Sequence, residues 1–429
     1  MDTIFALASA KGKSGIAVVR VSGENAHQAC SVICGGLPSP RSAGLRKIRH
    51  KGEFIDEALV LVFEAGRSFT GEPVVELHIH GSIATTRAVL MALGDQPGLR
   101  LAEPGEFTRR ALENGRLDLT QVEGLADLID AETEAQRRQA LAVMSGELGK
   151  RAKSWRADLV QALAFLDATI DFSEEEIPDG LLGHVLEIVD RLCESVEKEL
   201  KGGAAAERIR DGFEVAIVGE PNVGKSSLLN VLAGRDAAIT SDIAGTTRDV
   251  IEVRMDIGGL PVTLLDTAGI RDSDDVVEQI GVSRAIERAA AADIRIFLHV
   301  GEVRFPLEPR DGDLVVRAKA DLAHHGATDG LLISAKTGLG VETLIDRLRE
   351  VLTQRVAGSS LAIRERHRQI LGNASCALTR ARDGLKSGVL VELVSDDLRV
   401  AAMSMEMLIG KVGVEDLLGE IFSRFCIGK

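Results

Sequence analysis

The stretch that narrows the possible folds furthest lies at residues 219–226, which read Gly-Glu-Pro-Asn-Val-Gly-Lys-Ser. They fit the pattern G-x-x-x-x-G-K-[ST] of a phosphate-binding loop. The apolar run before it predicts a buried strand over 213–218, and the run after it predicts a helix opening at 227–232. Glycines let backbone N–H groups close around phosphate oxygens, and the helix N-terminus adds positive partial charge. We therefore expect Lys225 to reach the β- and γ-phosphates and Ser226 to ligate Mg²⁺.

Length and composition limit the class of protein. A chain of 429 residues predicts two or three domains, and 45% hydrophobic residues suffice for their cores. We find no apolar run long enough for a membrane span and no basic, then apolar, segment typical of a signal peptide. Five irregularly spaced cysteines indicate neither a disulfide framework nor a zinc site. The expected compartment is the cytosol.

The net charge of −14 argues against non-specific nucleic-acid binding by the whole surface. One local basic cluster stands out, formed by Lys150, Arg151, Lys153 and Arg156. We interpret it as a solvated helix face in preference to an RNA contact.

Residues 1–117 predict a small mixed α/β domain. Strands are expected at 16–21, 58–63 and 74–80, and a helix at 83–93. Glu76, His78 and His80 alternate with apolar residues, so they share one face of the third strand. This face could hold a metal ion, although a polar ligand pocket or a solvent-facing strand is the preferred interpretation.

Helical patterns dominate residues 118–209. Trp155, Leu159, Leu163, Leu166 and Ile170 recur at helical spacing. An acidic segment at 173–178 interrupts the pattern, a second amphipathic helix is expected at 185–200, and Gly202-Gly203 is expected to end it.

Strand and helix alternate in residues 210–356, which predicts a mostly parallel sheet covered on both faces. Residues 357–429 return to helices, expected at 363–385, 395–409 and 415–425. Because so short a segment makes a thin domain, we expect it to pack with 118–209. The nucleotide domain would then be an insertion whose two joints lie close together.

Further nucleotide signals follow the phosphate loop in GTPase order. Residues 245–249 (Gly-Thr-Thr-Arg-Asp) predict a loop in which a threonine completes Mg²⁺ coordination. Residues 266–269 (Asp-Thr-Ala-Gly) end a predicted strand, so that Asp266 would bind Mg²⁺ through water and the Gly269 N–H would meet the γ-phosphate. Residues 334–336 (Ser-Ala-Lys) are expected to contact the guanine carbonyl.

The base-reading motif is imperfect: residues 318–321 read Ala-Lys-Ala-Asp in place of Asn-Lys-x-Asp. Asp321 can still accept two N–H bonds from guanine, each worth about 1.5–3 kcal/mol. The missing asparagine normally ties this loop to the phosphate loop. We therefore expect guanine preference to persist with reduced affinity.

Ile270 occupies the position where Ras-type enzymes carry a glutamine that orients water. Since isoleucine cannot do this, we expect an acidic residue downstream to act instead. Glu278 is the candidate, and the alternative is that it is an ordinary acid at a helix N-terminus.

These motifs together resemble the bacterial tRNA-modification GTPases of the MnmE (TrmE) family. The resemblance rests on the nucleotide motifs, on the C-terminal Cys-Ile-Gly-Lys at 426–429, and on flanking motifs along the whole chain. The N-terminal ones are Arg-Val-Ser-Gly at 20–23, Ser-Phe-Thr-Gly-Glu at 68–72, Pro-Gly-Glu-Phe-Thr-Arg-Arg-Ala at 104–111 and Leu-Asp-Leu-Thr-Gln-Val-Glu at 117–123.

The resemblance implies a fold and a function. It implies a folate-binding and dimerising N-terminal domain (1–117), a discontinuous helical domain (118–209 and 357–429) and an inserted Ras-like P-loop GTPase domain (210–356). It implies a homodimer that works with the FAD protein MnmG (GidA) in a heterotetramer or larger complex. The pair would add an aminomethyl or carboxymethylaminomethyl group at C5 of the wobble uridine (position 34) of certain tRNAs, with 5,10-methylene-tetrahydrofolate as one-carbon donor and 5-formyl-tetrahydrofolate as its analogue.

The resemblance also assigns residues. Mg²⁺ ligands would be Ser226 and Thr247, and K⁺ ligands would be Asn222, Ser241, Ile243 and Thr246. Glu278 would position water, Arg248 is a further catalytic candidate, and the K⁺ charge would stand in for an arginine finger. The folate contacts would be Arg20, Glu76, Arg116 and Lys429. The expected GTP contacts are Asn222, Val223, Gly224, Lys225, Ser226, Ser227, Ser241, Asp242, Ile243, Ala244, Gly245, Thr246, Thr247, Asp266, Thr267, Ala268, Gly269, Lys319, Asp321, Ser334, Ala335 and Lys336.

Cys426 has two interpretations. A lone cysteine is commonly a small buried hydrophobe, whereas the resemblance suggests a place near the folate and a hypothetical role as nucleophile. The chain departs from the family at Ala318, and Val-Gly-Glu at 300–302 replaces the usual Val-Asp.

Two other function classes remain open at this stage. One is a K⁺-activated GTPase of ribosome assembly, which would carry an RNA-binding appendage such as a KH module; no convincing GXXG signature is present. The other is a scaffold whose GTP cycle reorganises a partner without performing uridine chemistry itself.

Overall fold

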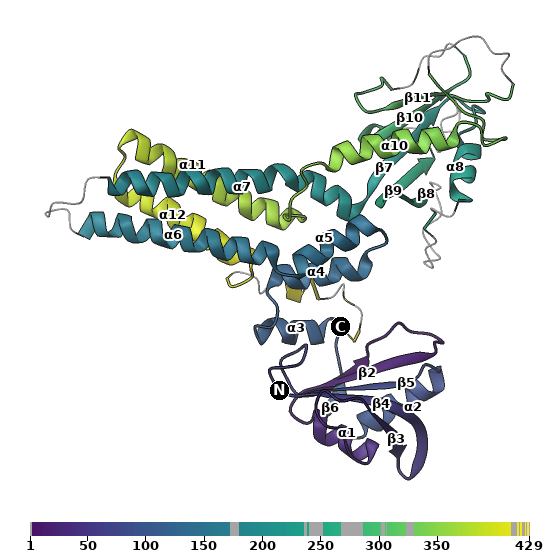
Figure 1. The fold of residues 1–429 in the computed structure, drawn as a ribbon, viewed down its shortest axis with the longest axis vertical. Helices are drawn as coiled ribbons and strands as arrows, with labels where there is room; N and C mark the ends of the chain where they lie inside the picture. Colours follow the sequence, from purple (N-terminus) through teal and green to yellow (C-terminus); the bar gives the residue numbers. More distant parts are fainter. Residues whose placement is uncertain are drawn as a thin grey trace, which may run out of the picture. The chain divides into compact units, whose positions relative to one another are not determined.

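A computed structural model describes residues 2–171, 180–235, 238–239, 252–266, 286–301, 305, 307–322, 330–412, 418–419, 421–422, 425 and 427–428. The chain divides into two compact units, Met1–Ala126 with Glu406–Lys429 and Asp127–Met405 (Figure 1). In the described part of the chain, none of the helices has both the length and the apolar character needed to cross a bilayer.

The first unit is built on a six-stranded sheet with the order β3-β4-β5-β2-β1-β6. Neighbouring strands are antiparallel, except that β1 and β6 are parallel. The strands are β1 (Thr3–Leu7), β2 (Ile16–Ser22), β3 (Gly44–His50), β4 (Glu53–Phe63), β5 (Val74–His80) and β6 (Leu99–Leu101). The helices are α1 (Ala26–Cys34), α2 (Ile83–Gly94), α3 (Glu106–Glu113) and α4 (Leu119–Asp130), the last of which runs into the second unit. The three strands and the helix predicted for this segment are confirmed as β2, β4, β5 and α2.

The two faces of this sheet differ because side chains alternate along each strand. One face carries Val19 and Leu77 into the apolar core that α1 and α2 complete. The other carries Ile4, which packs with Phe107 of α3 in a smaller apolar cluster. Arg20 and Glu76 belong to this second face, since they alternate with the core residues of β2 and β5.

The second unit contains long helices and a second sheet. Helix α7 packs against both α6 and α11, so the early and late helical segments lie together, as predicted (Figure 1). The helices are α5 (Glu134–Met144), α6 (Glu147–Asp171), α7 (Leu181–Asp211), α8 (Lys225–Ala233), α10 (Val341–Val356), α11 (Glu365–Ser387) and α12 (Val391–Leu408). The acidic segment 173–178 lies outside the described residues, as does most of the helix expected at 415–425.

The expected helix end at Gly202-Gly203 is wrong, because α7 continues to Asp211. A Cβ on Gly202 would lie 2.5 Å from the Gly358 carbonyl oxygen, and one on Gly203 would lie 3.0 Å from the Arg368 side chain. Glycine weakens a helix by about 1 kcal/mol relative to alanine. Because these two residues have no side chains, the segment around Gly358 can cross α7 at close range. The pattern of a single sequence cannot reveal such a crossing.

The crossing is held by Glu199, whose side chain is only 2% exposed. Its Oε1 accepts the backbone N–H groups of Leu361 and Ala362 at 2.5 and 3.0 Å. Its Oε2 pairs with Arg151. Arg151 is half-exposed and ion-paired within this unit, which agrees with the interpretation of the basic cluster as a solvated helix face.

The second sheet has the order β12-β11-β10-β7-β9-β8, and all neighbours are parallel except β8 and β9. Val215 and Ile217 face one apolar cluster, while Ala216 and Val218 face another, so both faces are covered as predicted. The strands are β7 (Phe213–Gly219), β8 (Glu252–Ile257), β9 (Leu260–Asp266), β10 (Ile294–His299), β11 (Leu314–Arg317) and β12 (Leu331–Leu332). The nucleotide motifs thus follow the ends of the parallel strands β7, β9, β11 and β12.

Candidate functional site: a nucleotide pocket and an N-terminal polar site

The phosphate loop has the predicted strand–loop–helix form. Strand β7 ends at Gly219, where a Cβ would lie 2.5 Å from the Leu298 carbonyl oxygen of β10, so glycine is required by close approach. The loop then turns through Asn222 and Gly224 with φ of 62° and 113°, and α8 begins at Lys225. Positive φ is easy for glycine and tolerated by asparagine, which explains these residue types at these places.

Lys225 closes the loop on itself. Its buried Nζ donates to the carbonyl oxygens of Gly219 and Glu220 at 2.8 and 2.9 Å. Burial lowers the pKa of Lys225, and the nearby Asp266 carboxylate counteracts that effect. A cation held at this position can form charge-assisted bonds to a polyphosphate.

Ser226 and Asp266 lie side by side, with the Ser226 hydroxyl donating to Asp266 Oδ2 at 2.7 Å. Asp266 Oδ1 is buried and has no hydrogen-bond partner among the described residues. Mg²⁺ prefers oxygen ligands and is commonly held by few protein groups together with substrate phosphates. The residues present fit that ion, and no group of three or more His, Cys, Asp or Glu in the described residues offers a complete protein cage.

The base-reading loops line a pocket of about 490 Å³ next to the phosphate loop. Predicted contacts that it brings together are Val223, Gly224, Ser227, Lys319, Asp321, Ala335 and Lys336. Leu298, Leu322 and Ile333 also line it and were missed, since single apolar residues carry no signal for nucleotide binding.

Asp321 is oriented by Ser334, whose buried hydroxyl donates to Asp321 Oδ1 at 2.7 Å. This hydrogen bond lowers the pKa of Asp321 and keeps the carboxylate charged. The geometry therefore gives Ser334 a supporting contact, while its neighbours Ala335 and Lys336 line the pocket. A charged acceptor suits the two N–H groups on the edge of guanine.

Ala318 keeps the backbone of the imperfect base motif in place. It is buried, and its N–H donates to the His299 carbonyl oxygen at 2.7 Å. Ala320 likewise donates to Ile333 O at 3.0 Å. The substitution therefore removes a side chain from the pocket wall without removing these backbone bonds.

Several predicted site residues lie outside the described residues. They are Ser241, Asp242, Ile243, Ala244, Gly245, Thr246, Thr247, Arg248, Thr267, Ala268, Gly269, Glu278, Cys426 and Lys429.

The N-terminal domain holds a second polar site, the Arg20 site, defined here as Arg20, Glu76, His78 and Arg116. Arg20 and Glu76 face each other in the β2–β5 register. Glu76 Oε1 accepts a hydrogen bond from Arg20 Nε at 2.9 Å and forms an ion pair with Nη2 at 2.8 Å. His78 Nε2 lies 3.6 Å from Glu76 Oε2 and is buried without a hydrogen-bond partner in the described structure. His80, by contrast, pairs with Asp56 at 2.8 Å. Among the described residues, no group of three His, Cys, Asp or Glu comes together on this strand, and the contacts of Glu76 agree with the polar-pocket interpretation.

Arg116 and the end of the chain approach the same domain. A Cβ on Gly71 would lie 3.3 Å from Arg116 Cγ. Ile427 forms an isolated antiparallel bridge with Pro104, and a Cβ on Gly428 would lie 2.0 Å from the Leu7 carbonyl oxygen. Cations beside a carboxylate and an unpartnered ring nitrogen fit a ligand that carries both carboxylates and ring N–H groups, as folate does.

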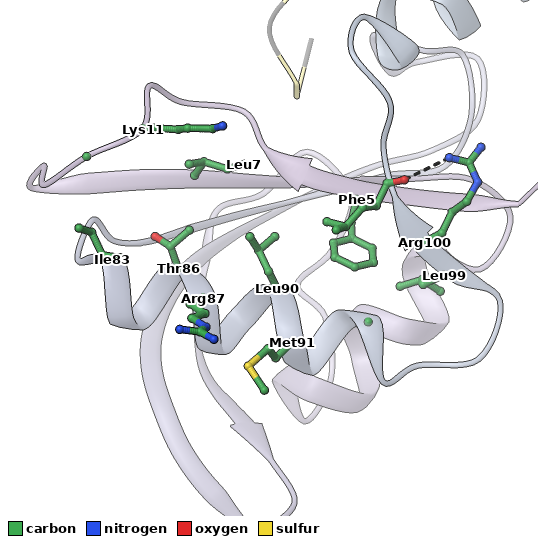
Figure 2. A pocket seen from close by; sticks show the side chains of 13 residues that line it. Phe5, Leu7, Lys11, Ile83, Thr86, Arg87, Leu90, Met91, Leu99 and Arg100 are labelled. Carbon is green, nitrogen blue, oxygen red and sulfur yellow. Dashed lines mark hydrogen bonds between the residues drawn. The ribbon is translucent and has the colours of Figure 1, made fainter.

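The opposite face of this domain has an apolar hollow of about 730 Å³ that sequence reasoning missed (Figure 2). Ile83 and Met91 of α2 and Leu101 of β6 line it and are at least 60% exposed. Lys11 and Arg87 also line it. The 83–93 pattern predicted the helix but gave no sign that part of its apolar surface stays uncovered. Exposed apolar surface of this kind commonly marks a protein contact.

Comparison with known proteins gives concordant results along the chain. Residues 3–116 match the family model of the GTP-binding protein TrmE N-terminus, and residues 119–426 match that of the MnmE helical domain. Three relatives are named tRNA modification GTPase MnmE, and each match covers 100% of both chains. Two come from Cereibacter sphaeroides: the one from strain ATCC 17025 is 55% identical over 432 residues, and the one from strain ATCC 17029 is 57% identical over 431. The third comes from Roseobacter denitrificans and is 53% identical over 431 residues. A crystal structure of Aquifex aeolicus Era bound to GDP·AlF4⁻ is 28% identical, with a TM-score of 0.26, over 32% of this chain and 56% of that one. The identity over the full length and the two family models show that this chain belongs to the MnmE family of tRNA modification GTPases.

Proposed function

We propose that this chain hydrolyses GTP and uses the cycle to drive modification of tRNA. The observation that carries the hydrolytic half is the Ser226–Asp266 pair at 2.7 Å beside the buried Lys225 ammonium. The identity to proteins named tRNA modification GTPase along the whole chain supports the other half. A tRNA substrate would place the activity in the cytoplasm.

In the nucleotide pocket, Lys225 binds the β- and γ-phosphates, and Asp321 reads the guanine edge while Ser334 holds it. Ser226 and Thr247 would hold Mg²⁺, which would supply positive charge to neutralise the phosphates. Asn222, exposed at the turn of the loop, offers a carboxamide oxygen to K⁺ together with Ser241, Ile243 and Thr246. Glu278 orients the attacking water and Arg248 assists catalysis.

In finer terms, we propose that the modification is an aminomethyl or carboxymethylaminomethyl group at C5 of the wobble uridine. The FAD protein MnmG would be the partner, and methylene-tetrahydrofolate would supply the one-carbon unit. The Arg20 site supports the folate part, because Glu76 can accept ring N–H groups while Arg20, Arg116 and Lys429 suit the carboxylates. Cys426 is retained as a candidate nucleophile.

We also propose that the chain is a homodimer formed through its N-terminal domain. The uncovered apolar hollow over α2 and β1 is the surface that supports this (Figure 2). Burying exposed Ile83, Met91 and Leu101 against a second copy would be favourable at about 25 cal/mol per Å². Met91→Asp should shift the protein toward monomer in sedimentation velocity, whereas Leu45→Asp, on the exposed side of β3, should not.

The experiment that tests the function is mass spectrometry of tRNA nucleosides from a strain lacking this chain. We expect C5-aminomethyl derivatives of wobble uridine to disappear and to return with the wild-type chain but not with Lys225→Ala. Unchanged wobble uridines would refute the tRNA half of the proposal. A purified chain that does not hydrolyse GTP would refute the other half, and hydrolysis that K⁺ does not stimulate would refute the K⁺ site alone.

A further inference from the structure

The Arg20 guanidinium is held by more than its ion pair. Its Cζ lies 5.5 Å from the centroid of the Phe69 ring and 5.7 Å from that of Phe107. Ring faces attract cations without consuming N–H donors. Nε donates to Glu76 and Nη2 lies 2.8 Å from Glu76 Oε1 within the ion pair, while Nη1 makes no hydrogen bond to any described residue. One end of the guanidinium is therefore fixed, and the other keeps donors available.

We propose that Phe69 and Phe107 are positioning residues, which hold the Arg20 guanidinium so that its remaining donors meet an anionic group of the folate ligand. This inference rests on the proposed folate site. The Arg20 side chain is 21% exposed, and an ion pair alone leaves it torsional freedom that binding must remove at a cost in affinity. Two ring contacts restrict that freedom before the ligand arrives.

The loop that carries Phe69, residues 68–72, is itself strongly held. Ser68 Oγ donates to the Glu72 carbonyl oxygen at 2.5 Å, and the Thr70 hydroxyl lies 2.7 Å from Ser22 Oγ. The Glu72 carboxylate accepts from Arg110 Nη1 at 3.0 Å. Because these bonds lie inside the domain, the loop has little freedom to carry Phe69 away from Arg20.

The same loop reaches the second cation of the site. Gly71 has φ of 82° and approaches the Arg116 side chain so closely that a Cβ would lie 3.3 Å from Cγ. Asn114 Nδ2 also donates to the Thr70 carbonyl oxygen at 2.8 Å, which ties the loop to the segment that leads to Arg116. One five-residue loop therefore contacts both arginines assigned to the folate.

A purely structural role for Phe69 is the competing explanation, since it also packs on the apolar cluster of Ile4, Ala6 and Phe107. The two roles differ in what they require of the side chain. Packing needs apolar volume, which leucine and methionine supply. Holding a guanidinium over a ring needs an aromatic face, which tyrosine supplies as well.

The test is calorimetric titration of the full chain with 5-formyl-tetrahydrofolate. We expect Phe69→Leu to weaken affinity about 2-fold to 30-fold, the range of one cation–π contact, and Phe69→Tyr to stay within about twofold of wild type. Phe54→Leu is the matched control, because Phe54 stacks on Arg49 at 5.8 Å on the β3–β4 hairpin, away from the Arg20 site. GTP binding should be unchanged in all three variants.

The outcomes separate this inference from the proposal beneath it. A wild-type chain that does not bind 5-formyl-tetrahydrofolate overturns the folate site and the inference together. Wild-type binding with unchanged affinity in Phe69→Leu overturns the inference alone, as does equal loss in Phe69→Tyr. If Phe69→Leu does not fold, Phe69→Met takes its place under the same criteria.

Discussion

The phosphate loop and the Arg20 site differ in how much of the chain each needs. The loop is one run of eight residues whose backbone makes most of the site. The Arg20 site draws on β2, β5 and the segment after α3, is contacted by the 68–72 loop, and consists of side chains. A contiguous site depends on local geometry, whereas a dispersed site depends on strand register, because a slip of one residue would turn Glu76 to the opposite face.

The largest expected effect falls on the contiguous site. Lys225→Ala removes the buried ammonium, which now donates to the Gly219 and Glu220 carbonyl oxygens. Two charge-assisted bonds to phosphate would be worth about 1.5–3 kcal/mol each, so we expect a loss of GTP affinity of about 100-fold or more. Titration with a fluorescent GTP analogue measures it. Lys198→Ala, on the exposed side of α7, should match wild type. If 5-formyl-tetrahydrofolate binding fell as well, the two sites would not be independent.

Ligand binding at the Arg20 site should instead depend on the stability of the N-terminal domain. Burial raises the pKa of Glu106, but hydrogen bonds from Arg100, the Glu103 backbone and Arg110 outweigh it and lower that pKa to about 2. Glu106→Gln removes the carboxylate that Arg110 Nη2 contacts at 3.0 Å, while Glu72 still pairs with Nη1, and should destabilise the domain by about 1.5–3 kcal/mol. Urea unfolding measures this, with exposed Glu103→Gln expected to change stability by less than about 0.5 kcal/mol.

The same carboxylate sets an acid limit for this domain. The pKa of the Glu106 carboxyl is about 2 in the folded domain and has its ordinary value near 4.5 in the unfolded chain. Its contribution to the free energy of unfolding is therefore complete above about pH 4.5 and is lost as the pH falls toward 2. Unfolding of wild type at successive pH values should show that loss, and Glu106→Gln should lack it. Identical pH profiles for the two proteins would contradict the assignment.

Within the Arg20 site, Glu76→Gln keeps the shape of the side chain and removes its charge. We expect affinity for 5-formyl-tetrahydrofolate to fall about tenfold, because a bond to a charged acceptor is replaced by a neutral one. GTP hydrolysis should be unchanged. His80→Gln on the same strand, exposed and paired with Asp56, is the control, and equal losses in both variants would refute a specific role for Glu76.

The smallest effect concerns the base motif. Ala318→Asn should raise GTP affinity severalfold, since an amide can tie the base loop to the phosphate loop at about 1 kcal/mol per bond. Preference for GTP over ATP should already be present in wild type, because Asp321 remains. Competition titration measures both quantities. Ala318→Leu fills the space without hydrogen bonds and should bring no gain, whereas an equal gain would point to packing.

These contrasts explain how far the sequence could be interpreted. Residues 219–226 predicted their own strand, loop and helix because motif and periodicity are local, and the alternation in β5 placed Glu76 and His78 on one face. The pairing of Glu76 with Arg20 was not predicted, because the register between β2 and β5 is a tertiary property. The helix end predicted at Gly202-Gly203 was wrong for the same reason. These glycines make room for a segment much further along the chain, since Gly358, which approaches Gly202, is 156 residues away. The apolar hollow beside α2 could not be predicted, because a helical pattern does not indicate whether other elements cover the apolar face of the helix.

Glu199 and Gly202 of α7 contact the segment that follows the GTPase domain. This contact bears on whether that domain can be exchanged. The last helical residue before the inserted domain is Asp211, and the chain comes back to α7 at Gly202, nine residues earlier and therefore about 13 Å along the helix axis. A bridge of about four to six extended residues spans that gap. The host helices could thus be joined directly after excision of residues 213–356, or could accept a foreign domain whose ends lie equally close. The GTPase domain is therefore a unit that recombination can remove or exchange while the helical domain stays intact.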